Sequence, residues 1–187
     1  SAVLFTILIT CKDQGTNPAE QLKDPREMTW TADTIKMPDT AIQLLPLDML
    51  VVSPNNIWIA FWVGHGQLWH YDGNNWKVSE DIGGGINCLA KKSDTDLWAG
   101  GRIGRYDGDN VAVANYKNGT WIWNEMTIKG EILDMSTDTQ GNVWACGRNG
   151  LVMKYSNNIW IADTINIKLG TNFSYLLAGI KYYNSKI

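Results

Sequence analysis

Three arginines follow similar apolar runs in neighbouring parts of this sequence. Arg102 and Arg105 come just after residues 96–100, and Arg148 comes just after residues 142–146. A guanidinium group stays charged and presents its N–H donors in a planar fork, so converging arginines bind carboxylates and phosphates. Arg102, Arg105 and Arg148 therefore form a candidate site for an anionic ligand.

Catalysis at these arginines would need further groups. Enzymes that hydrolyse acidic glycosides combine arginines with a tyrosine and a glutamate, and no Tyr–Glu pair is placed beside the arginines by its spacing. The sequence also holds no Ser-His-Asp grouping, phosphate-binding loop or dinucleotide-binding fingerprint. We therefore expect neither catalytic residues nor a cofactor.

Metal-binding patterns are weak. Residues 107–110 begin like a calcium loop but lack its third carboxylate and its distal glutamate. His65 and His70 have no Cys or carboxylate at ligand spacing, so we expect no bound metal. Cys88 and Cys146 fall in apolar runs of successive units, which predicts two buried thiols, with a disulfide in an oxidising compartment as the alternative.

Composition narrows the class of protein. The length of 187 residues suits one domain, and 19% charged and 44% hydrophobic residues exclude an acidic disordered tail and a coiled coil. The net charge of −3 gives no reason to expect a nucleic-acid partner. Ten tryptophans are unusual for this length, and their placement decides the fold.

The body of the chain is a repeat. Three similar runs are centred on Trp58, Trp98 and Trp144. Each is followed by a tyrosine that stands five residues before another tryptophan: Tyr71/Trp76, Tyr116/Trp121 and Tyr155/Trp160. Residues 30–57 also align without a gap with residues 160–187, at a distance of about three periods of about 43 residues.

Each unit holds four short β-rich runs separated by turn residues. A four-stranded sheet with two apolar faces needs a neighbour on both, so we predict an all-β β-propeller of four-stranded antiparallel blades. The tryptophans of the last strands should fill the widening gaps between blades, the alternative being a sugar-stacking surface. The expected repeat region is 30–187, with complete units at about 47–80, 87–125 and 133–164.

The ends of this region predict partial blades. Residues 30–36 match a last strand and residues 177–187 match a first strand. Because propellers typically have four to eight blades, we expect a fragment of a longer chain, truncated at both ends. The alternative is a complete four-blade ring closed by residues 30–36, with one thin blade.

The repeats have a family likeness. The run Asn142–Gly147 and the hairpin His70–Trp76 resemble the repeats of secreted bacterial β-propellers, including the sensory ectodomains called two-component regulator propellers. This resemblance implies the fold but no particular activity. Residues 136–144 also resemble the Asp-box of sialidases with one extra residue, which predicts that Asp138 caps a structural turn.

The N-terminus indicates export. Residues 1–10 are uncharged and mostly apolar, like the core of a secretory signal. Leu8–Cys11 resembles the lipobox of bacterial lipoproteins, in which the cysteine is lipidated, although Thr10 departs from the small residues that family prefers. We interpret residues 1–11 as a signal remnant and residues 12–29 as a polar tether. The alternative is a buried first strand with an ordinary cysteine.

These interpretations predict a non-catalytic lipoprotein of the bacterial cell envelope. A lipid on Cys11 would hold it at the periplasmic face or the cell surface, and we expect no other membrane contact. Its propeller would bind or scaffold a protein or glycan, since short variable loops are where such folds place binding residues. Two alternatives are the ectodomain of a bacterial sensor and a glycan-processing hydrolase or lyase.

Overall fold

The computed structural model describes residues 32, 34–35, 43–104, 110–165 and 179–180. The chain divides into two compact units, Ser1–Thr34 and Ile35–Ile187. The second unit contains all the strands of the described residues, and no helix occurs among them.

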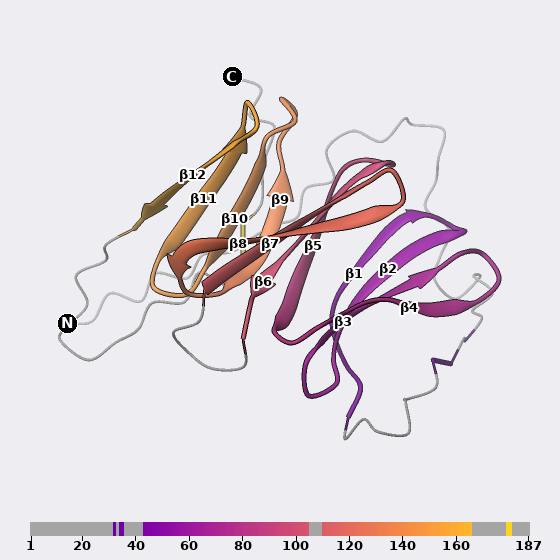
Figure 1. The fold of residues 1–187 in the computed structure, drawn as a ribbon. Coiled ribbons are helices and arrows are strands. Elements are labelled where there is room, and N and C mark those ends of the chain that lie inside the picture. The colour runs from indigo at the N-terminus through magenta and orange to yellow at the C-terminus, as the bar shows by residue number, and fades with distance from the viewer. Residues whose placement is uncertain (1–31, 33, 36–42, 105–109, 166–178, 181–187) are drawn as a thin grey trace, which may run out of the picture. The chain divides into compact units, whose positions relative to one another are not determined.

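Twelve strands form three separate sheets of four, each antiparallel and in chain order (Figure 1). This confirms the predicted all-β fold of propeller-like blades. The first sheet contains β1 (Leu45–Ser53), β2 (Asn56–Trp62), β3 (Gly66–Tyr71) and β4 (Trp76–Ile82). The second contains β5 (Gly85–Ser93), β6 (Asp96–Arg102), β7 (Asn110–Lys117) and β8 (Thr120–Lys129). The third contains β9 (Ile132–Thr137), β10 (Val143–Gly147), β11 (Leu151–Ser156) and β12 (Ile159–Thr164).

The first strands of the three sheets are neighbours, with β5 packed against both β1 and β9. Apolar side chains from facing sheets meet in two clusters. One lies between the first and second sheets and contains Trp58, Leu68, Leu89 and Leu97. The other lies between the second and third sheets and contains Val113, Ile132, Met135 and Met153. The middle sheet is therefore buried on both faces, as its apolar strands predict.

One aromatic contact repeats at both junctions. The Trp58 ring centroid lies 4.9 Å from that of Tyr116 and 5.4 Å from that of Trp121, both in the next sheet. At the second junction, Trp98 lies 4.6 Å from Tyr155 and 5.6 Å from Trp160. The Tyr and Trp that stand five residues apart in the sequence thus both contact the tryptophan of the preceding sheet.

The tryptophans of the last strands fill apolar space, as expected. Trp121 is buried, while Trp160 and Trp76 are partly buried against apolar clusters. Trp76 packs with Ile35 and Leu44 against the face of the first sheet that points away from the second, beside Phe61.

A hydrogen bond also repeats between first strands. Asp48 in β1 accepts a hydrogen bond of 2.7 Å from the backbone N–H of Leu89 in β5. Asp134, at the corresponding position of β9, accepts one of 2.7 Å from the N–H of Ile180. Ile180 therefore takes the place beside the third sheet that Leu89 takes beside the first. Most of the expected partial blades, 30–36 and 177–187, lie outside the described residues.

Glycines permit close backbone contact where the second strands end. A Cβ atom on Gly101 would lie 1.9 Å from the carbonyl oxygen of Gly85, and one on Gly147 would lie 2.0 Å from that of Glu131. Both obstacles are backbone atoms, which no rotamer change can move. The second strand of a sheet can therefore lie close to the start of its first strand only if it carries no side chain there.

We expect Gly101→Ala to lower the free energy of unfolding by about 3 kcal/mol, because the added methyl group overpacks this crossing. Gly83→Ala is the matched control, since a Cβ there meets no atom within 4 Å, and it should change stability by less than about 0.5 kcal/mol. Urea unfolding of both variants checks this. Equal stability of the two proteins would contradict the close packing described.

Candidate functional site

Two of the three predicted arginines meet at one carboxylate. Arg102 Nε lies 3.4 Å from Glu131 Oε1, and Arg148 Nε donates a hydrogen bond of 2.7 Å to Glu131 Oε2. Arg102 ends β6 in the second sheet and Arg148 directly follows β10 in the third, so the site joins neighbouring sheets. Arg105 lies outside the described residues, as does Cys11.

The backbone holds Glu131 in the segment between β8 and β9. Its carbonyl oxygen accepts a hydrogen bond of 3.1 Å from Arg148 N–H. Asn87 Nδ2 donates to both Glu131 Oε1, at 2.8 Å, and the carbonyl oxygen of Ile132, at 2.7 Å. Glu131 is thus fixed from two sheets and orients both guanidinium groups.

Among these three side chains, two guanidinium groups face one carboxylate, so the three together carry a formal charge of +1. Glu131 and Arg102 are largely buried, whereas the side chain of Arg148 is 47% exposed. The arrangement thus presents an oriented guanidinium group to solvent, and such a group can bind an external carboxylate or phosphate.

Sequence analysis missed Glu131 and Asn87. Neither belongs to a motif, and each is a single polar residue beside an apolar run. The only available signal was the identical position of the two arginines at the ends of repeated strands, which predicted convergence but not the residue on which they converge.

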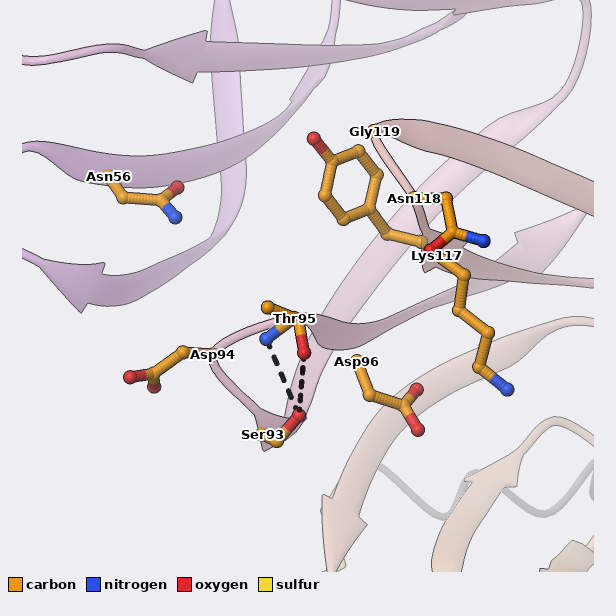
Figure 2. A pocket seen from close by; sticks show the side chains of 9 residues that line it. Asn56, Ser93, Asp94, Thr95, Asp96, Lys117, Asn118 and Gly119 are labelled. Carbon is orange, nitrogen blue, oxygen red and sulfur yellow. Dashed lines mark hydrogen bonds between the residues drawn. The ribbon is translucent and has the colours of Figure 1, made fainter.

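A cavity of about 630 Å³ opens at the turn end of the β5–β6 hairpin, opposite the end that carries Arg102 (Figure 2). It is formed by the β5–β6 turn, the β7–β8 turn and Asn56 at the start of β2. The sequence predicts turns at these positions and nothing more. The lining residues are Asn56, Ser93, Asp94, Thr95, Asp96, Tyr116, Lys117, Asn118 and Gly119.

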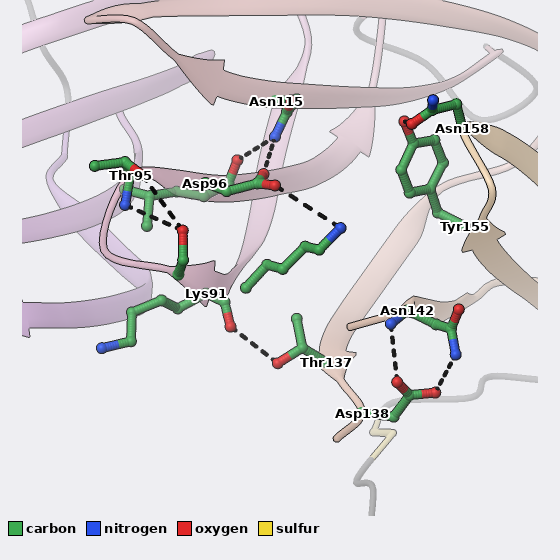
Figure 3. Close-up of polar contacts among 12 residues, drawn as sticks. Lys91, Thr95, Asp96, Asn115, Thr137, Asp138, Asn142, Tyr155 and Asn158 are labelled. Atoms are coloured by element: carbon green, nitrogen blue, oxygen red, sulfur yellow. Dashed lines mark hydrogen bonds and ion pairs between the residues drawn. The ribbon is translucent and has the colours of Figure 1, made fainter. Parts of the chain in front are cut away.

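The Asp138 turn is structural, as the Asp-box resemblance predicted (Figure 3). Its carboxylate accepts hydrogen bonds from the N–H groups of Gln140 and Asn142, from Asn142 Nδ2 and from Trp144 Nε1, at 2.7–3.0 Å. Desolvation by burial favours the neutral acid, but these hydrogen bonds together outweigh it and lower the pKa of Asp138 to about 2.

We expect Asp138→Ala to lower the free energy of unfolding by about 1 kcal/mol near neutral pH, because four donors lose a charged acceptor. The pKa of Asp138 is lower in the folded than in the unfolded chain, so its contribution is complete above about pH 4 and is lost as pH falls through about 2. Urea unfolding as a function of pH measures the difference.

Asp163→Ala on β12 is the control for this prediction, since Asp163 accepts only a local hydrogen bond from its neighbour Thr164 in the described structure. It should alter stability by less than about 0.5 kcal/mol at every pH. A difference between wild type and Asp138→Ala that stays constant with pH would contradict the role assigned to the ionised carboxylate.

Both cysteines of the sheets are buried thiols that form no disulfide bond, as predicted. Desolvation is the main cause that raises the pKa of Cys88 well above its usual value, with nearby Asp48 and Asp134 adding to it. Desolvation also raises the pKa of Cys146 to about 11. The thiolate is the reactive form of cysteine, and a raised pKa keeps both side chains protonated at neutral pH. Their reactivity is therefore low.

The two histidines form polar contacts within the first sheet. His65 Nε2 lies 2.8 Å from Asp81 Oδ1, and His70 Nε2 lies 3.0 Å from Asn56 Oδ1. Across the ranges that the structure describes, no group of three or more His, Cys, Asp or Glu residues is placed to hold a metal ion. Nor do those ranges include a helix with the length and hydrophobicity to span a bilayer.

No protein-family model matches this sequence, and no curated protein matches it.

Proposed function

We propose that this chain is a non-catalytic binding module of the bacterial cell envelope, anchored as a lipoprotein through Cys11. Its propeller-like sheets bind a ligand that carries a carboxylate group, at the strand ends where Arg102 and Arg148 converge. The convergence of these two arginines on Glu131 is the observation that carries the proposal.

The geometry supports binding for a physical reason. Glu131 lies below the surface and fixes Arg148, so little conformational entropy is lost when an external anion binds to the exposed part of the guanidinium group. Arg102, which is largely buried beside the other oxygen of Glu131, adds a second positive charge close to Arg148. A carboxylated glycan of the envelope or its surroundings has the charge this site requires.

We expect the chain to retain carboxylated glycans on a glycan array. Arg148→Gln should weaken the best of them about tenfold, which corresponds to about 1.4 kcal/mol for one charge-assisted contact. Binding should also weaken with added salt. Affinities from calorimetric titration of the retained glycan provide the measurement.

Lys77→Gln is the matched control. It removes the same charge from β4, beside the β3–β4 turn, where Lys77 pairs with Asp72 at 2.6 Å. Equal losses from Arg148→Gln and Lys77→Gln would reveal a general charge effect and contradict the proposed site. Retention of no carboxylated glycan would contradict the ligand class.

The lipid anchor has its own test. In bacterial cells that express the chain behind a start methionine and a short basic stretch, which complete the signal, and that are fed an alkyne-labelled palmitate, the wild-type protein should carry the label and sediment with membranes. Cys11→Ser should lose both properties, because the thiol that takes the lipid is gone. Cys146→Ala, which removes a buried thiol instead, should keep them. Labelled Cys11→Ser protein would rule out the anchor at this position.

A further inference from the structure

The cavity in Figure 2 has the lining of a sugar-binding site, and we propose that it binds an uncharged sugar residue. This site is separate from the arginine site. Ser93 pairs with Asp96 at the turn end of the β5–β6 hairpin, whereas Gly85 pairs with Arg102 at its other end. The inference therefore goes beyond the proposed function and does not depend on it.

The size of the cavity suits a small ligand. Its volume of about 630 Å³ falls within the range of about 300–1,000 Å³ that is usual for small-molecule sites. It is partly open to solvent, which allows a sugar at the end of a longer glycan to enter while the remainder stays outside.

The lining groups match hydroxyl chemistry. Asp94 and Asp96 supply carboxylate acceptors, while Lys117 supplies an ammonium donor. Ser93, Thr95 and Tyr116 carry hydroxyls, and Asn56 and Asn118 carry amides, which both donate and accept. Each sugar hydroxyl also donates and accepts, so a mixed lining satisfies it. Asp94 and Asp96 also pair with lysines outside the lining, Lys91 at 3.0 Å and Lys92 at 3.9 Å. The charges around the cavity are therefore largely compensated within the protein, which favours an uncharged ligand.

Several lining groups are held in place before any ligand arrives. Asp96 Oδ1 accepts a hydrogen bond of 2.6 Å from Asn115 Nδ2 (Figure 3), and Asp94 Oδ1 accepts one of 3.0 Å from Lys91 Nζ. Asn56 Oδ1 accepts one of 2.8 Å from Trp58 Nε1. This contact fixes the amide so that Nδ2 is its donor for a ligand. Preorganised groups lose less entropy on binding.

Tyr116 gives the cavity a rigid aromatic wall. Its ring contacts Trp58 at 4.9 Å and Trp121 at 5.3 Å between centroids. The tyrosine is therefore held by the same packing that joins the first two sheets. Aromatic rings offer apolar surface with a polar tip, which suits a sugar ring whose C–H groups lie against the phenol and whose hydroxyls reach the surrounding polar groups.

The β7–β8 turn allows a clean test. Asn118 has a left-handed φ of 53°, and its counterpart in the β11–β12 turn, Asn157, has a φ of 51°. Gly73 occupies the corresponding position of the β3–β4 turn with a φ of 92°. Glycine adopts this conformation without strain, so Asn118→Gly and Asn157→Gly both keep their turns. Only Asn118 lines the cavity of Figure 2.

The probes are the methyl glycosides of glucose, galactose, mannose and N-acetylglucosamine, each tested at up to about 10 mM by saturation-transfer NMR on the whole chain. At least one should bind, and Asn118→Gly should weaken it about tenfold, as expected when one paired polar group is lost in a small site. Asn157→Gly should bind like wild type, and both variants should keep the wild-type melting temperature within a few degrees.

Two results would overturn the inference: no binding of any of the four glycosides, or equal affinity of wild type and Asn118→Gly. The Arg148→Gln variant separates the two sites. It should bind the uncharged glycoside like wild type, and loss of that binding would show that the sugar occupies the arginine site instead.

Discussion

The packing of a tryptophan from one sheet between a tyrosine and a tryptophan of the next is the interaction on which this structure depends. Trp58 and Trp98 make it at successive junctions. No sheet of four short strands with two apolar faces is stable alone, and each of these large rings is buried against the neighbouring sheet. The hydrogen bond from Leu89 to Asp48 adds direction to a contact that apolar packing leaves unoriented.

The candidate binding residues lie at the ends of the strands, outside the apolar junctions between the sheets. At one end, glycines such as Gly147 let the backbone of neighbouring segments approach closely, and this brings Glu131 between arginines of two sheets. At the other end, hairpin turns gather short polar side chains around Tyr116. The aromatic packing that stabilises the junction between the first two sheets also fixes the orientation of the Tyr116 side chain. The stability of the first junction and the cavity around Tyr116 therefore share one set of contacts.

Much of the fold could be predicted because its signals are local and repeated. Turn residues, short apolar runs and the Tyr–Trp spacing each occur three times, which chance does not produce. Asp138 was predicted as a turn residue for the same reason. The candidate sites were harder to predict from the sequence. Arg102 and Arg148 were predicted to converge from their positions in the repeat, but Glu131 and Asn87 are single residues with no pattern.

The sequence by itself therefore determined the strands, their grouping in fours and the need of each sheet for a neighbour, because these follow from short-range periodicity and from the burial of apolar faces. Only the tertiary structure decided which carboxylate orients the arginines and which turns enclose the cavity around Tyr116. Those contacts join residues well separated in the sequence, such as Arg148 with Glu131, 17 positions apart, and Asn87 with Glu131, 44 positions apart. Their geometry depends on how one sheet is placed against the next, which no local pattern of residues encodes.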